Sequence, residues 1–149
     1  MTGFRFRLER LLQLRSRTEQ ERAAELGAAL RDEEVQQAAL EAAVARLGRV
    51  GEQILENSER VTTAGVLRNQ GLTLEAAARQ IEEAECSHDE AVEAVEDRQE
   101  RYGEARKDRR VIERLRERRL AAWETETQRE EQKETDGIAR RRHQEGKQT

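Results

Sequence analysis

The sequence contains no proline, a single cysteine and very few aromatic residues. Aromatic side chains make up 3% of the 149 residues, and the 35% that are hydrophobic include a large share of alanine. This composition excludes the thick apolar core of a globular domain of this length. Because no proline interrupts the chain, long segments can remain helical. Ala, Glu, Arg, Gln and Leu, which favour helices, are abundant, so the composition predicts long helices with a thin core.

The lone cysteine and the lack of long apolar runs bear on where the protein works. With only Cys86 present, no intrachain disulfide can form, which suits a reducing compartment. The start, Met1 to Arg7, lacks the apolar stretch of a signal peptide. No apolar run approaches the roughly 20 residues that a membrane span needs. We therefore expect a soluble, cytoplasmic protein.

The chain also lacks an excess of charge of one sign. Its 28 basic and 32 acidic residues leave a formal net charge of −4. A general nucleic-acid binder presents a surface of one sign, so this balance argues against that function. The run Arg140 to Arg142 is the one alternative, and nucleic-acid binding through it would weaken steeply with salt.

Motifs for catalysis and metal binding are missing as well. Cys86 and His88 form a Cys-x-His pair without a second pair nearby, whereas a zinc site needs four ligands. The acidic cluster Glu82, Glu83 and Glu85 is better explained as a solvated helix face. A two-stranded coiled coil has no cavity in which to build an active site. The sequence therefore predicts no enzyme, no cofactor and no metal.

What the sequence does contain is hydrophobic periodicity, in two blocks predicted as helices over residues 4–56 and 74–136. Each block alternates steps of four and three residues, the a/d pattern of a coiled coil. Near Ile112 the phase of the second series shifts. Val111, Leu115 and Ala122 or Trp123 are predicted to continue it. The first series is Leu26, Leu30, Glu33, Gln37, Leu40, Val44, Leu47, Gly51 and Ile54, and the second is Ile81, Ala84, His88, Ala91, Val95, Arg98, Tyr102, Ala105, Arg109 and Ile112.

The segment between the two blocks, residues 57–73, is rich in turn and capping residues and is predicted as a loop. Thr73 is the predicted cap of the second helix. Two helices of similar length joined by one loop pack antiparallel. We therefore predict an all-α fold, a long antiparallel two-helix coiled-coil hairpin that forms a single elongated domain over residues 1–149. Residues 137–149 are predicted to be a frayed, disordered tail.

Three of the four aromatic residues, Phe4, Phe6 and Trp123, fall at the open end of this hairpin. They can seal the end by packing against one another. They can also enter a pocket of a partner, because aromatic and arginine side chains dominate binding energy at interfaces. The two roles are compatible.

The same end carries short charged motifs. The stretch from Phe4 to Leu12, followed by Leu14-Arg15, resembles the opening of the FliJ family of flagellar type III export proteins. Residues 112–119, Ile-Glu-Arg-Leu-Arg-Glu-Arg-Arg, are similar to its "LEKLKE(R/K)" segment, and residues 129–136 to its "EQK…D/E" pattern. The sequence departs from the family at Ile112, where leucine is usual, and at Gly137, which interrupts the terminal helix.

The resemblance implies a non-catalytic, stalk-like coiled coil in the cytoplasm, peripherally associated with the inner-membrane export apparatus. It implies three partners: the hexameric export ATPase, which the stalk activates, the membrane export gate, and export chaperones. The stalk protein of a virulence secretion system and a purely structural scaffold remain alternatives. The residues that the resemblance assigns to the ATPase-facing end are Phe4, Phe6, Leu8, Leu11, Leu12, Ile112, Leu115, Arg118, Arg119 and Trp123.

Overall fold

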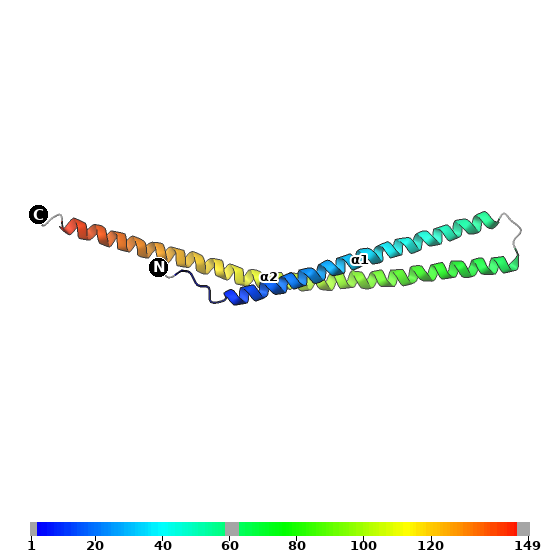
Figure 1. Ribbon diagram of the computed structural model, residues 1–149, viewed down its shortest axis with the longest axis horizontal. Coiled ribbons are helices and arrows are strands. Elements are labelled where there is room, and N and C mark those ends of the chain that lie inside the picture. The colour runs from blue at the N-terminus through cyan, green and yellow to red at the C-terminus, as the bar shows by residue number, and fades with distance from the viewer. Residues whose placement is uncertain (1–2, 59–62, 146–149) are drawn as a thin grey trace. The chain divides into compact units, whose positions relative to one another are not determined.

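The computed structural model describes residues 3–58 and 63–145, with side chains described as far as Arg141. These residues form two helices, α1 (Glu9–Ser58, 50 residues) and α2 (Ala64–Glu145, 82 residues), and no strand. The helices run in opposite directions and pack against each other (Figure 1). The predicted all-α helical hairpin is confirmed.

The contacts of the chain divide it into two units. The turn unit, Gln20–Glu104, contains the parts of α1 and α2 on either side of the turn, drawn from blue through cyan and green to yellow-green in Figure 1. The terminal unit contains Met1–Glu19 and Ala105–Thr149. Whether the two units unfold together is a matter of cooperativity, so the single domain over residues 1–149 stays a prediction.

The turn is shorter than predicted, because α1 reaches Ser58 and α2 already begins at Ala64. Thr63 caps α2: its carbonyl accepts a hydrogen bond from Leu67 N at 3.1 Å, and its hydroxyl accepts one from Val66 N at 3.4 Å. Thr73, the predicted cap, lies inside the helix, where its hydroxyl donates to the Asn69 carbonyl at 2.9 Å. Weak helix formers destabilise a helix but do not end it as proline does. The loop was therefore predicted to be longer than it is. Residues 59–62 of the predicted loop lie outside the described residues.

The outer limits of the helices also differ from the prediction. α1 begins at Glu9 and not at Phe4, after a non-helical segment in which Glu9 N donates to the Phe6 carbonyl at 3.2 Å. α2 continues through Glu145, so the predicted disordered tail is wrong as far as that residue. Gly137 stays helical, and its carbonyl accepts a hydrogen bond from Arg141 Nε at 3.3 Å. Residues 146–149 lie outside the described part of the chain.

The half-buried side chains of α1 form a regular heptad row, but at two positions it contains the residue before the predicted one. The predicted Gln37 and Gly51 are half-buried, as are Gln36 and Val50 beside them. Leu30 and Val44 are 48% and 52% exposed, whereas Ala29 and Ala43 are half-buried. At both positions the prediction favoured the larger side chain of the neighbouring pair. Alanine is accommodated instead, because small side chains at a helix contact let the two axes approach. The observed row is Leu12, Arg15, Glu19, Arg22, Leu26, Ala29, Glu33, Gln36, Leu40, Ala43, Leu47, Val50 and Ile54.

The heptad row of α2 matches the prediction at every position from Ile81 to Ile112, all of which are buried or half-buried. Ala77 and Ala91 are the most buried, at 5% exposure each. Beyond Ile112 the prediction is partly wrong: Val111 is 65% exposed and Ala122 is exposed. Leu115, Leu120 and Thr127 are half-buried there instead.

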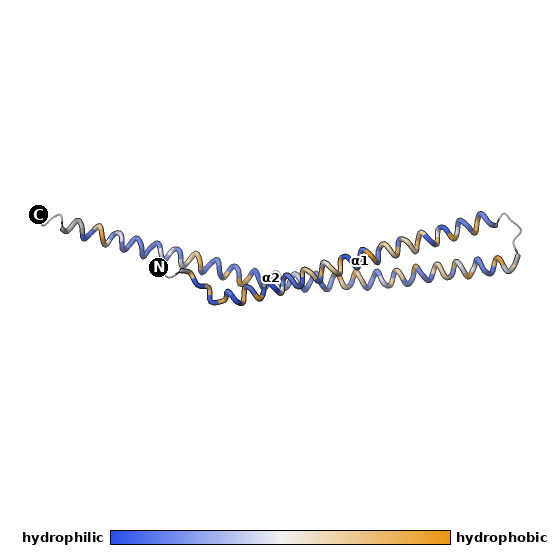
Figure 2. The backbone as a smooth tube through the Cα atoms, viewed as in Figure 1, coloured by the Kyte–Doolittle hydropathy of each residue, from blue (hydrophilic) through white to orange (hydrophobic). Residues whose placement is uncertain are grey.

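Apolar residues recur in short patches along both helices (Figure 2). Over the described residues, neither helix contains a stretch long and apolar enough to cross a membrane.

Candidate functional site

The ten residues predicted to face a partner all belong to the terminal unit. Seven of them are half-buried, namely Phe4, Phe6, Leu8, Leu11, Leu12, Ile112 and Leu115. The other three, Arg118, Arg119 and Trp123, are exposed. The unit thus presents an apolar surface that is incompletely covered, with arginines beside it. Their binding role stays a prediction.

The non-helical segment before α1 packs on α2 through an aromatic pair. The ring centroids of Phe4 and Trp123 lie 6.0 Å apart, with the rings tilted by 51°. This is a favoured spacing for aromatic rings. Trp123 nevertheless remains 39% exposed. The pair therefore closes this end of the hairpin and leaves part of the indole available for a partner.

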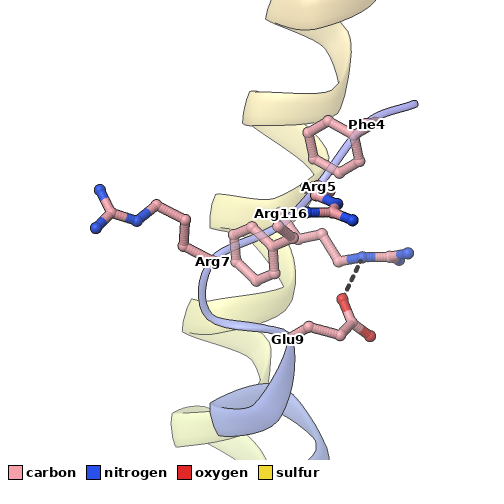
Figure 3. A pocket seen from close by; sticks show the side chains of 6 residues that line it. Phe4, Arg5, Arg7, Glu9 and Arg116 are labelled. Atoms are coloured by element: carbon pink, nitrogen blue, oxygen red, sulfur yellow. Dashed lines mark ion pairs between the residues drawn. The ribbon is translucent and has the colours of Figure 1, made fainter. Parts of the chain in front are cut away.

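A cleft of about 490 Å³ opens beside Phe4 (Figure 3). Arg116 on α2 and Glu9 at the start of α1 bridge one side of it, with Arg116 Nε and a Glu9 carboxylate oxygen 3.2 Å apart. Arg7 extends outward from the non-helical segment (Figure 3). The cleft combines phenyl rings with cationic groups, a lining that suits an apolar side chain flanked by carboxylates. Its lining residues are Phe4, Arg5, Phe6, Arg7, Glu9 and Arg116.

A second hollow, of about 270 Å³, lies on one face of α2 and is lined by Val111, Arg114, Leu115 and Arg118. Residues spaced by three, four and seven positions share one side of a helix. Val111 therefore belongs to an exposed stripe in which apolar and basic side chains alternate.

Charged residues occupy the helix contact where the heptad row predicts apolar ones. Arg109 on α2 pairs with Glu19 on α1, and its Nη1 lies 2.7 Å from a carboxylate oxygen of Glu113. Arg15 Nη1 lies 3.0 Å from the Asp108 carboxylate. The hydrogen bond to Glu19 raises the pKa of Arg109 above its usual range. The sequence predicted Arg109 at the contact but not its partners, because pairing them requires the register between the helices.

Charge is unevenly distributed between the two units, which the small net charge of the whole chain conceals. The turn unit, residues 20–104, carries 20 acidic and nine basic residues, a net charge of −11. The terminal unit carries 12 acidic and 19 basic residues, a net charge of +7. Sequence reasoning missed this segregation because it summed charge over the whole chain.

The candidate metal ligands predicted from the sequence, Cys86 and His88, belong to the turn unit. His88 Nε2 lies 3.3 Å from a Glu33 carboxylate oxygen across the helix contact. Cys86 is exposed, with its Sγ 3.8 Å from Glu90 Oε1. Across residues 3–58 and the described part of α2, no three or more potential metal ligands come together.

Comparison with known proteins places this hairpin in a family. The family model described as "Flagellar FliJ protein" matches residues 4–148. Neither the curated proteins nor the solved structures contain a match. The matched range includes both helices and the non-helical segment that carries Phe4 and Phe6. The chain therefore belongs to the flagellar FliJ protein family and is a component of the flagellar export apparatus.

Proposed function

We propose that the chain is a non-catalytic, central-stalk-like activator of the hexameric export ATPase, and that the terminal unit is the part that enters the ring. The observation that carries this proposal is the incomplete burial of the aromatic end. Trp123 keeps 39% of its surface exposed although Phe4 packs on it. Aromatic and arginine side chains on a rigid helical support are the groups that contribute most to protein interfaces.

The two-helix architecture supports the stalk role for a further reason. A ring of subunits needs a rigid, narrow element to contact several subunits at once, and a helical hairpin supplies one. Cationic groups around the cleft of Phe4 and Phe6 add the means to recognise carboxylates on the ring. In the same proposal the chain also contacts the membrane export gate and export chaperones, and it reaches the membrane only through these partners.

The test is ATP hydrolysis by the cognate export ATPase with and without this chain. Phe6→Ala and Leu115→Ala each remove an apolar group from the predicted ring-facing surface, while helicity should persist because neither residue is fully buried. We expect wild-type protein to stimulate hydrolysis and each variant to lose at least about tenfold in apparent affinity for the ATPase.

The matched control is Val35→Ala, an exposed apolar residue of the turn unit. It should stimulate hydrolysis as well as wild type does. If wild-type protein neither binds nor stimulates the ATPase, the stalk proposal is wrong. A structural scaffold of the export apparatus would then be the better description.

A further inference from the structure

The basic terminal unit exposes a stripe of alternating apolar and cationic side chains on α2. We define the basic stripe as Lys107, Val111, Arg114, Leu115 and Arg118, whose spacing places them on one face of the helix. All of them are exposed except Leu115, which is half-buried. None of its three cations takes part in an ion pair with another described residue. The stripe therefore offers unsatisfied positive charge together with apolar surface.

The acidic turn unit exposes a stripe of the opposite charge on α1. We define the acidic stripe as Leu30, Glu34, Gln37, Glu41 and Val44, which also share one helix face. Leu30 and Val44 are two large apolar residues that the heptad row leaves in solvent. Gln37 Nε2 donates to Glu41 Oε1 at 2.9 Å, which holds that carboxylate at the surface. This stripe pairs negative charge with apolar surface.

The charged groups of the two stripes have the same spacing. Lys107 and Arg114 are two helical turns apart, and so are Glu34 and Glu41. At 1.5 Å of rise per residue, each pair spans about 10 Å along its helix. Two helices laid side by side can therefore bring both cations onto both carboxylates at once.

We propose that two copies of the chain associate by placing the basic stripe of each copy on the acidic stripe of the other. The complementary surface is present on the chain itself, with net charges of +7 and −11 on the two units. The contact also removes Leu30, Val44 and Val111 from water, which favours association.

This pairing limits the stalk role if the proposed function holds. Leu115 and Arg118 belong both to the basic stripe and to the predicted ATPase-facing residues, so a chain in the dimer cannot present them to the ring. Self-association would then hold the chain in an inactive form until the ATPase is available.

Sedimentation velocity on the full chain tests the proposal. At about 20 mM salt, where charges are weakly screened, we expect a dimer that forms as concentration rises. At about 0.5 M salt the dimer should dissociate to monomer. Association that is unchanged or strengthened by salt would overturn the proposal, because it would have to be driven by apolar contacts alone.

Charge reversal identifies the surfaces. Lys107→Glu with Arg114→Glu, and separately Glu34→Arg with Glu41→Arg, should each weaken self-association at least about tenfold. Mixing these two double variants should restore dimers between them, because each reversed stripe then meets its complement. Circular dichroism establishes that both variants remain helical.

Two matched controls separate the stripes from total charge. Lys133→Glu with Arg140→Glu changes the charge of the terminal unit equally, and Glu82→Arg with Glu85→Arg does the same in the turn unit, all at exposed positions outside the stripes. Both controls should dimerise more strongly than the stripe variants. The proposal fails if wild type is monomeric at low salt, or if mixing the stripe variants restores nothing. The stripes would then serve a partner other than a second copy.

Discussion

At the scale of single residues, Arg109 shows how the helices of the terminal unit are held together. Its guanidinium reaches Glu19 on α1 and Glu113 on its own helix, and its side chain is 23% exposed. Glu19 is only 15% exposed. Two charges withdrawn this far from water favour the folded state only while they remain paired, since either one alone would be poorly solvated.

Replacing one member of this pair should therefore be worse than replacing both. We expect Arg109→Leu to lower the melting temperature by several degrees, because Glu19 loses its partner. Glu19→Leu should have a smaller effect, since Arg109 keeps Glu113. The double variant should melt at or above the wild-type temperature, because two leucines then pack together.

Thermal unfolding followed by circular dichroism measures these differences. Arg129→Leu is the control, because Arg129 forms only an exposed pair with Glu126, 3.7 Å apart on the same helix, and should change little. A double variant no more stable than Arg109→Leu would show that charge pairing is not what stabilises this contact.

At the scale of the helix, the start of α2 is determined by one threonine. Thr63 satisfies backbone N–H groups of the first turn, whereas Thr73 is an interior residue whose hydroxyl bonds back to Asn69. Thr63→Ala should destabilise the protein by about 1 kcal/mol. Thr73→Ala should be neutral or slightly stabilising, because alanine is the better helix former.

Urea unfolding of the two alanine variants distinguishes the two positions. A greater loss of stability from Thr73→Ala than from Thr63→Ala would place the cap where the sequence predicted it and contradict the observed start of α2.

The helix contacts show which part of the fold the sequence could predict. From Ile81 to Ile112 the row in α2 was predictable, because Ile81, Val95 and Ile112 are large apolar residues that set its phase. In α1, Leu30 and Val44 follow directly after Ala29 and Ala43, and hydrophobicity alone selects the larger residue. Only packing against the second helix decides in favour of alanine, and that requires the partner's surface.

At the scale of the whole molecule, α2 is unevenly supported. Ala77 and Ala91, in the turn unit, are buried. From Glu124 to Arg141, in contrast, every residue is exposed except Thr127 and Gly137, which are half-buried. Short unsupported helices are marginal in water. Backbone amides in that stretch should therefore exchange with deuterium about tenfold or more faster than those around Ala91.

Native-state hydrogen exchange read by mass spectrometry provides this profile. Equal protection along α2 would mean that its C-terminal part is stabilised by something other than the packing described here. Adding the export ATPase should slow exchange there only if this part of α2 also contacts the ring.

The candidate site was predictable to a different extent from the fold. The aromatic end could be located, because Phe4, Phe6 and Trp123 are rare residues at the ends of two periodic blocks. The hollow beside Val111 and the pairing of Arg109 could not, since both depend on how far α2 is rotated against α1. The opposite charges of the two units were visible in the sequence only once the chain was divided where the structure divides it.

The contact between Phe4 and Trp123 also makes the protein its own optical probe. Trp123 is the only tryptophan, and its indole lies against the segment that precedes α1. Its fluorescence therefore reports on one place in the chain, without any label. Release of Phe4 would move the emission to longer wavelength, and burial in a partner would move it to shorter wavelength, so a single spectrum separates an opened end from an occupied one.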